Sequence, residues 1–151
     1  MSRLHHLPRF LISLALCLTA ATGAQAREMV SVARAEVNLR AGAGTQHEAL
    51  WVLSKGYPLE VTRRKGQWLQ VRDFENDTGW IFRPLVGKKA HHVVKSKVVN
   101  LRRSPSTRSP IVGKATRGEV LRTLERRSDW VKVQQDGGPR GWVARRLLWG
   151  W

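Results

Sequence analysis

The feature that most constrains this chain is an internal duplication. The stretch "EVNLRAGAGT" begins at Glu36, and "VVNLRRSPST" begins at Val98. When residues 37–86 are laid over residues 99–148, no insertion is needed, and fourteen of the fifty pairs are identical. Self-similarity at a fixed spacing indicates a repeated structural unit. The pairs that remain identical include glycines and tryptophans in register: Gly56/Gly118, Gly79/Gly141, Trp68/Trp130 and Trp80/Trp142.

Each copy shows the alternation that is typical of β-strands. "WLQVRDF" places Leu69 and Val71 on one face, and "WVKVQQD" repeats this with Val131 and Val133. "GYPLEVT" and "GEVLRTL" predict an earlier strand in each copy. The turn-rich stretches "ENDTG" and "DGGPRG" predict the hairpin that follows. Short strands with turns at this spacing predict an all-β fold of two tandem small barrels.

Residues 1–26 differ in kind from the rest. Arginines at the start, the short apolar run "FLISLALCLTAA" and the small residues of "AQA" ending at Ala26 form the three-part pattern of a cleaved signal peptide. The run is too short to span a membrane. Cys17, the only cysteine, lies in this segment. The expected mature chain therefore has no disulfide, no thiolate nucleophile, no cysteine-bound metal and no transmembrane segment.

The duplication sets the expected domain boundaries. The first domain is predicted at residues 27–86, a linker at 87–92, and the second domain at 93–151 with a C-terminal aromatic tail, "LLWGW". Units of about 60 residues are near the lower limit for an independent hydrophobic core. We therefore expect the copies either to pack against each other or to be individually only modestly stable. The tail could dock on the other copy or touch a membrane interface, where Trp is favoured; we expect docking, because the segment is too short to serve as an anchor.

The chain is strongly basic, with a formal net charge of +16. The excess is uneven: it is +4 over residues 27–89 and +10 over residues 90–151. Such a charge attracts anionic surfaces in a salt-dependent way. Because a signal peptide is expected at residues 1–26, the expected anions are lipid head groups, lipopolysaccharide and cell-wall polymers, and nucleic acid is not an expected partner.

The order of the motifs resembles that of the bacterial SH3-like domain. In the first copy these are Val37-Asn38-Leu39-Arg40, a Gly-rich loop that ends at Thr45, Gly56, Trp68 and Gly79-Trp80-Ile81. The second copy repeats this order from Val99 to Leu147, with the loop ending at Thr107. The resemblance covers nearly all of residues 29–151 and also extends to exported proteins that carry two such domains.

The resemblance implies a small β-barrel that binds rather than catalyses. It further implies an exported protein, periplasmic or secreted, associated with peptidoglycan or with the enzymes that process it. The chain has a single tyrosine, Tyr57, and lacks the acidic, Tyr-rich loop of eukaryotic SH3 domains. Recognition of Pro-rich ligands therefore does not follow from the resemblance.

The tryptophans that alternate against the apolar face are the candidate binding residues. Trp68 and Trp130 are expected to stand partly exposed, whereas Trp80 and Trp142 are expected in the core. Trp and Arg are the residue types enriched at binding hot spots. We hypothesise a groove floored by Trp68 or Trp130, in which an arginine meets a carboxylate; coverage of a barrel end or of the interface between copies is the alternative. The candidate ligand-binding residues are Trp68, Arg64, Tyr57, Trp130, Arg126 and Arg127.

The sequence does not favour an enzyme. After residue 26 the histidines are His47, in the first loop, and His91-His92, in the expected linker. A metal site needs three or four converging ligands, and a catalytic base needs a nucleophile and an orienting partner. Neither pattern is recognisable, so we expect no catalytic residue, no metal and no cofactor.

The expected function is that of an exported binding protein that recognises peptidoglycan or a cell-wall-processing partner. Two linked weak modules gain affinity for a polymeric ligand through effective concentration. Two alternatives remain at this stage. The first is a scaffold or regulatory partner of another envelope protein, and the second is electrostatic attachment to anionic lipid or lipopolysaccharide. The sequence does not specify the oligomeric state.

Overall fold

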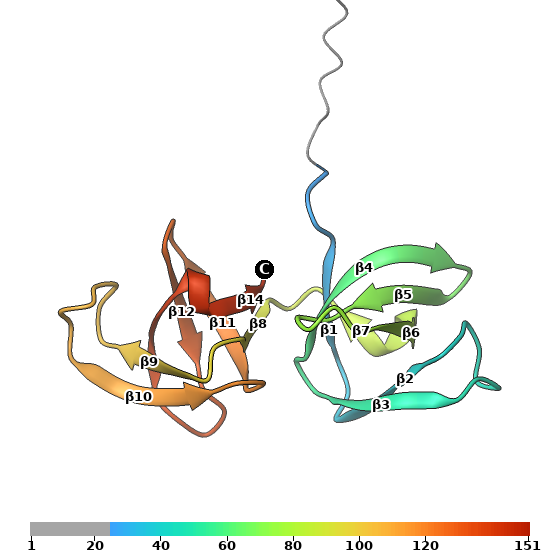
Figure 1. The fold of residues 1–151 in the computed structure, drawn as a ribbon, viewed down its shortest axis with the longest axis horizontal. Coiled ribbons are helices and arrows are strands. Elements are labelled where there is room, and N and C mark those ends of the chain that lie inside the picture. The colour runs from blue at the N-terminus through green and yellow to red at the C-terminus, as the bar shows by residue number, and fades with distance from the viewer. Residues whose placement is uncertain (1–24) are drawn as a thin grey trace, which may run out of the picture.

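Two antiparallel sheets of seven strands make up the protein, one from each copy of the repeat (Figure 1). The computed structural model describes residues 25–151. The predicted all-β class, with one small sheet-built unit for each copy, is thus confirmed, while residues 1–24, most of the expected signal peptide, lie outside the described part. Within residues 25–151, no helix is long and apolar enough to cross a membrane.

The first sheet is built from the first copy, and one 3₁₀ turn precedes its last strand. Its elements are β1 (Met29–Val32), β2 (Glu36–Arg40), β3 (Ala49–Ser54), β4 (Pro58–Lys65), β5 (Trp68–Arg72), β6 (Thr78–Phe82), η1 (Arg83–Leu85) and β7 (Val86–Gly87). The order across the sheet is β3-β2-β6-β5-β4-β1-β7.

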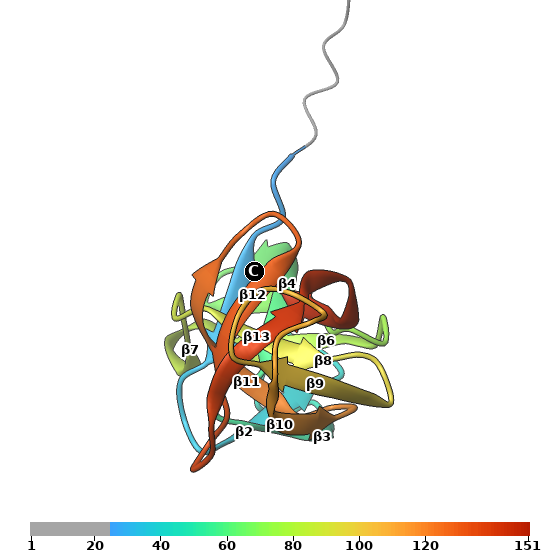
Figure 2. The same ribbon diagram turned by 90° about the vertical axis from the view of Figure 1, so that its left-hand side faces the viewer.

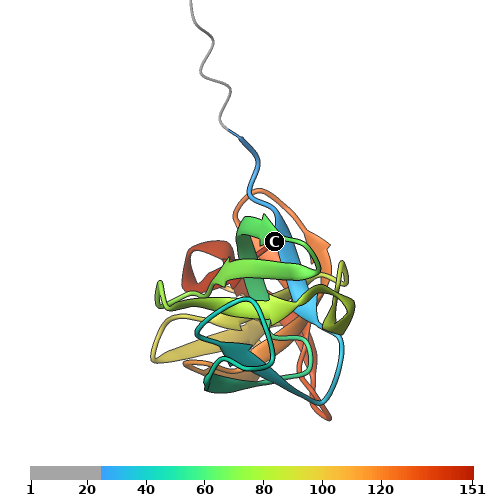
Figure 3. The ribbon, with the colours of Figure 1, turned by 90° about the vertical axis from the view of Figure 1, so that its right-hand side faces the viewer.

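The second sheet repeats this plan. Its elements are β8 (His91–Val94), β9 (Val98–Arg102), β10 (Ile111–Thr116), β11 (Val120–Arg126), β12 (Trp130–Gln134), β13 (Arg140–Ala144), η2 (Arg145–Leu147) and β14 (Leu148–Gly150). The order across this sheet is β10-β9-β13-β12-β11-β8-β14, which is the order of the first sheet with seven added to each strand number. Figures 2 and 3 look onto the second and the first copy, and in each the strands curl around a common interior.

The strand register extends the repeat beyond the segment seen in the sequence. Val30 pairs with Leu59 in the first sheet, and His92 pairs with Leu121 in the second, so His92 stands where the first copy has Val30. Val86 likewise pairs with Val32, as Leu148 pairs with Val94. The spacing of 62 residues therefore holds from the first strand of each sheet to the last.

His91 and His92 belong to a strand and not to a connecting segment. Both lie in β8, whose backbone pairs with β11 on one side and β14 on the other. The expected linker, residues 87–92, thus ends inside the second sheet, and only residues 88–90 lie between the two sheets. The sequence interpretation missed the strand because "HHVV" is short and shows no alternation.

Each barrel has a core of alternating strand residues. The inward-facing residues of β5 and β12 are fully buried, as their alternation predicts: Leu69, Val71, Val131 and Val133. Trp80 and Trp142 are also buried, at 8% and 5% exposure. The outward faces of Trp80 and Trp142 are covered by arginines, since Arg63 lies 5.7 Å from the ring of Trp80 and Arg127 lies 4.7 Å from that of Trp142. These are distances that favour a cation–π interaction.

The two barrels contact each other through side chains far apart in the sequence. Arg117, between β10 and β11, forms an ion pair of 3.0 Å with Glu75 and lies 5.2 Å over the ring of Phe74, both in the β5–β6 turn of the first copy. In the same way Arg27 lies 5.0 Å over Trp149 in β14. The expected docking of the tail on the other copy is therefore only part of the arrangement: residues 148–150 form β14, which pairs with β8 of its own copy, and Trp149 in addition contacts Arg27 at the start of the first copy.

The repeated Gly-Trp motif has a steric cause. A Cβ atom placed on Gly79 would lie 2.5 Å from Cγ of Leu39, and one on Gly141 would lie 2.8 Å from Cβ of Leu101. Both leucines are fully buried. β6 and β13 can cross β2 and β9 this closely only because the position carries no side chain.

Substituting Gly79→Ala should therefore destabilise the first barrel. Overpacking of a filled core costs about 1–3 kcal/mol, and we expect a loss of this size in the free energy of unfolding measured by urea denaturation. Gly87→Ala is the matched control, because a Cβ at Gly87 meets no atom within 4 Å. Equal stability of the two variants would contradict the steric account.

Candidate functional site

The arginine that closes the repeated Asn-Leu-Arg motif fastens the first loop of each copy. Nη1 of Arg40 donates hydrogen bonds to the carbonyl oxygens of His47, at 2.9 Å, and Thr45, at 3.3 Å. In the second copy, Nη1 of Arg102 donates to the carbonyl of Ser109 at 2.9 Å. The loops differ in sequence, yet each is bonded to the strand that precedes it. This explains why the motif survives while the loops diverge.

In the first copy, the fastened loop forms one wall of a groove with an aromatic floor. The cavity measures about 220 Å³, and Trp68, Phe82 and Thr45 line it together with residues of β2. The ring centroids of Trp68 and Phe82 are 5.3 Å apart, and the two ring planes are inclined at 44°. Aromatic pairs favour such a separation and tilt. Trp68 is half-buried, so one part of its ring supports the barrel and another faces the groove.

The second copy has a corresponding groove of about 480 Å³. Trp130 and Thr107 line it, at the positions equivalent to Trp68 and Thr45. Phe82 is replaced by Ala144, which opens the floor, and the wall gains Arg145 and Arg146. The two grooves therefore share a Trp and a Thr, but the second is larger in volume. Its lining carries two arginines and Asp129, whereas that of the first carries Arg40 and Glu36.

The sequence hypothesis placed Trp68 and Arg64 in one groove. Trp68 lines the groove, but Arg64 does not, so the hypothesis is wrong for Arg64. Arg64 forms an ion pair with Glu28 and does not line the Trp68 groove. Arg40 lies there instead. The reason is strand pairing: Lys65 faces Trp68 across β4 and β5, and Arg64 projects to the other side of the strand. The hydrogen bonds from Arg64 and Lys88 hold the pKa of the Glu28 carboxyl below its usual range.

The other candidate residues also lie outside the grooves. Tyr57 packs against the core of the first barrel, and its hydroxyl donates a bond of 3.4 Å to Asp73; burial and the neighbouring Asp73 raise its pKa. Arg127 stacks on Trp142 and pairs with Glu125 at 2.9 Å. Arg126 faces a cavity between the two copies. Of the six candidates, only the two tryptophans line the grooves.

The sequence analysis missed several residues of these sites. Thr45 and Thr107 were detectable as an identical pair in the repeat, and Arg40 as the end of a repeated motif. Phe82 carried no such signal, because its counterpart is Ala144.

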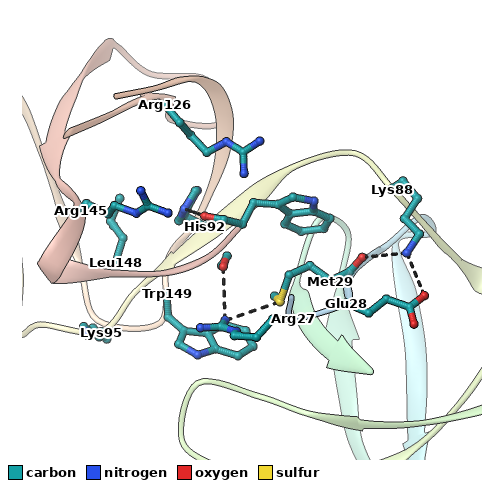
Figure 4. A pocket seen from close by; sticks show the side chains of 12 residues that line it. Arg27, Glu28, Met29, Lys88, His92, Lys95, Arg126, Arg145, Leu148 and Trp149 are labelled. Atoms are coloured by element: carbon teal, nitrogen blue, oxygen red, sulfur yellow. Dashed lines mark hydrogen bonds and ion pairs between the residues drawn. The ribbon is translucent and has the colours of Figure 1, made fainter. Parts of the chain in front are cut away.

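The cavity between the two copies measures about 650 Å³ (Figure 4). Arg126, Arg145 and Lys95 approach it from the second copy, and Arg27, Glu28, Met29 and Lys88 approach from the first. Trp149 in β14 forms part of the wall.

His92 is a buried polar residue in the wall of this cavity. It is 2% exposed. In the neutral ring, Nε2–H donates to the backbone oxygen of Trp151 at 2.8 Å and Nδ1 accepts a bond of 2.7 Å from the hydroxyl of Thr123. The Thr123 hydroxyl can partner Nδ1 in either protonation state, and it is burial that favours the neutral ring. Burial, together with Arg126, Arg145 and His91, lowers the pKa of His92 to about 4, although the bond to the Trp151 carbonyl acts in the opposite direction.

No group of three or more His, Cys, Asp or Glu side chains that could hold a metal ion is found within residues 25–151. The grooves contain rings, hydroxyl groups, an amide, guanidinium groups and one carboxylate each, that of Glu36 in the first and of Asp129 in the second. That chemistry suits the recognition of a polar or sugar-containing ligand by stacking and hydrogen bonds.

Comparison with known proteins gives matches for both copies. Residues 33–88 match one model of the bacterial SH3 domain, and residues 97–148 match another. Among curated proteins, 128 residues are 23% identical to a Bacillus subtilis (strain 168) protein named "Putative N-acetylmuramoyl-L-alanine amidase YrvJ"; the match covers 78% of this chain and 24% of that protein. The chain thus spans about a quarter of the length of this relative.

Two solved structures are also similar. NlpC2 from Trichomonas vaginalis has a TM-score of 0.38 and 12% identity over 83% of this chain and 48% of that chain. An NlpC/P60 family protein from Bacillus cereus has a TM-score of 0.39 and 11% identity over 82% and 56% of the two chains.

The buried neutral His92 predicts a specific acid sensitivity. The unfolded chain protonates this ring below about pH 6.5, whereas the folded chain resists protonation down to about pH 4. The contribution of His92 to stability is therefore fully present above pH 6.5. It is lost as the pH falls towards 4, by roughly 3 kcal/mol in total.

His92→Gln retains an amide that can donate to Trp151 and accept from Thr123, but it does not titrate. Stability measured by urea denaturation between pH 7.5 and pH 4 should therefore fall more steeply in the natural protein than in this variant. The difference between the two curves isolates His92 from His91, whose pKa is also lowered by burial. Parallel curves would contradict the assignment.

Proposed function

We propose that this chain, which belongs to the bacterial SH3 domain family and carries two such domains in tandem, binds the bacterial cell wall through the tryptophan groove of each domain. The observation that carries the proposal is the duplicated groove. In both copies a half-buried Trp lies beside a Thr from a loop that an arginine fastens. A polar, ring-rich ligand such as a glycan with peptide branches matches this chemistry.

The arrangement of two grooves favours a polymer over a small soluble ligand. A shallow groove of this size supplies modest affinity by itself. When one domain is bound, the second is held at a high effective concentration, provided that the ligand offers a second site within reach. A wall polymer repeats its chemical groups and meets that condition, which supports the wall as the target.

The matched relative points to the same target. Its name describes an enzyme that acts on N-acetylmuramoyl-L-alanine, a linkage of the cell wall. The present chain covers a quarter of that protein, and we do not extend the amidase activity to it. We propose that this chain binds and does not catalyse, and that it acts outside the cytoplasm, in the periplasm or after secretion.

The test is co-sedimentation with purified wall sacculi at low and at high salt. We expect the natural protein to sediment at both, because a groove interaction made by rings and hydrogen bonds is screened less than surface charge. The double variant Trp68→Ala, Trp130→Ala should bind at least about tenfold more weakly, since truncating an aromatic anchor costs 1–2 kcal/mol or more.

Trp51→Ala is the matched control. Trp51 lies on β3, is 54% exposed and lines neither groove. Thermal unfolding of each variant checks the fold, and Phe82→Ala provides a milder change in the first groove. Sedimentation that disappears at high salt, or that is weakened equally by Trp51→Ala, would contradict groove binding; the first result would indicate attachment by charge alone. No sedimentation at either salt would point to a protein partner.

A further inference from the structure

The cavity between the two domains carries a net positive charge. Its volume of about 650 Å³ lies in the range of small-ligand sites. It is distinct from the tryptophan grooves and shares only Arg145 with the second of them. Five basic side chains and one acidic side chain line it: Arg27, Lys88, Lys95, Arg126, Arg145 and Glu28.

Comparison of the two copies shows how this charge arises. In the first copy, Arg64 is neutralised by Glu28. Its equivalent in the second copy is Arg126, and the position equivalent to Glu28 is Ala90. Within the described part of the chain, Arg126 has neither an ion pair nor a side-chain hydrogen bond. The second copy thus retains the arginine and lacks the carboxylate that would neutralise it.

Other differences between the copies also fall on the cavity wall. Lys95 stands at the position equivalent to Ala33 and adds a cation to the wall. Trp149 stands at the position equivalent to Gly87 and adds an aromatic ring. His92 stands at the position of Val30 and fixes Trp151 by the bond to its carbonyl oxygen. Both copies share the same strand order. Lys95, His92 and Trp149, which line the cavity from the second copy, have no equivalents of the same type at these positions in the first.

The cations differ in how far they are already paired. Lys88 pairs with Glu28 at 3.0 Å, and Arg27 pairs with Glu60 at 3.5 Å. In residues 25–151, no acidic side chain pairs with Lys95, Arg126 or Arg145. In Figure 4 the side chains of Arg126 and Arg145 extend from the second copy towards the side that carries Arg27 and Met29. Cations gathered around a concave surface focus the field and attract an anion.

We propose that this cavity binds a short peptide through a carboxylate of that peptide. The guanidinium of Arg126 presents the planar pair of donors that matches a carboxylate. Lys95 and Arg145 add positive charge beside it. The apolar part of the ligand packs on Trp149 and Leu148, of which the former is partly exposed.

The size and the mixed lining favour a peptide over a simple anion. An inorganic phosphate fills a small part of 650 Å³ and makes no use of Trp149, Leu148 or Met29. A peptide of two to four residues fills the space and brings an anionic group, amides and apolar side chains together. The site does not depend on the proposed wall binding, because it contains neither groove tryptophan and shares only Arg145 with the two grooves.

The experiment is an NMR titration of the full chain with the tripeptide Ala-Glu-Ala. The reporters are the ring signals of His92, identified by their absence in His92→Gln, and the indole signal of Trp149. We expect saturable shifts of both. The uncharged analogue acetyl-Ala-Gln-Ala-amide should cause no shifts at the same concentration.

The variant Arg126→Gln should weaken binding about tenfold, the effect of losing one charge-assisted contact. Lys95→Gln should change it in the same direction. Arg103→Gln is the control, because it removes the same charge from an exposed position in the second copy that does not line the cavity; we expect less than a twofold change.

Three results would overturn the proposal. The neutral peptide could shift the same signals equally, inorganic phosphate could bind as tightly and displace the peptide, or Arg103→Gln could weaken binding as much as Arg126→Gln. The second result would make the cavity a general anion site, and the third would reduce the effect to net charge. Because no sacculi are used, failure here leaves the test of the tryptophan grooves unaffected.

Discussion

The closure of each barrel depends on the close approach of two strands that are far apart in the sequence. β6 reaches β2 where Arg40 and Trp80 pair, and β13 reaches β9 where Arg102 and Trp142 pair. A glycine beside each tryptophan allows the approach. The same closure brings the loop after β2 next to the start of β5, so Thr45 lies beside Trp68. The binding groove is thus a direct consequence of how the barrel closes.

Duplication of a stable framework left the surfaces free to differ. Both copies keep the crossing glycine, the loop-fastening arginine and the groove tryptophan. The second copy has a groove of larger volume. It also has Ala90 at the position of Glu28, the acid that neutralises Arg64 in the first copy. Part of the larger positive charge of the second half therefore lies at the junction of the domains, in the side chains of Lys95, Arg126 and Arg145, which are unpaired within residues 25–151.

Much of the fold was predictable from the sequence, because it follows from local patterns. The alternation of apolar and polar residues predicted which side chains of β5 and β12 face inward, and the same pattern occurs in both copies. The partner of Arg64 was not predictable, since Glu28 precedes the segment in which the copies align visibly. The role of His92 was missed for a related reason: burial of a histidine depends on Thr123 and Trp151, and neither stands near it in the sequence. Side-chain pairings across sheets and between domains are set by register and closure, which a linear pattern does not encode.

The most direct test of the central claim is chemical-shift mapping of the protein with soluble wall fragments. The account predicts that the largest shifts fall on Trp68, Thr45 and Phe82 in the first domain and on Trp130 and Thr107 in the second. Shifts confined to the exposed apolar residues Leu50, Trp51 and Val52 of β3, with both grooves unaffected, would contradict it.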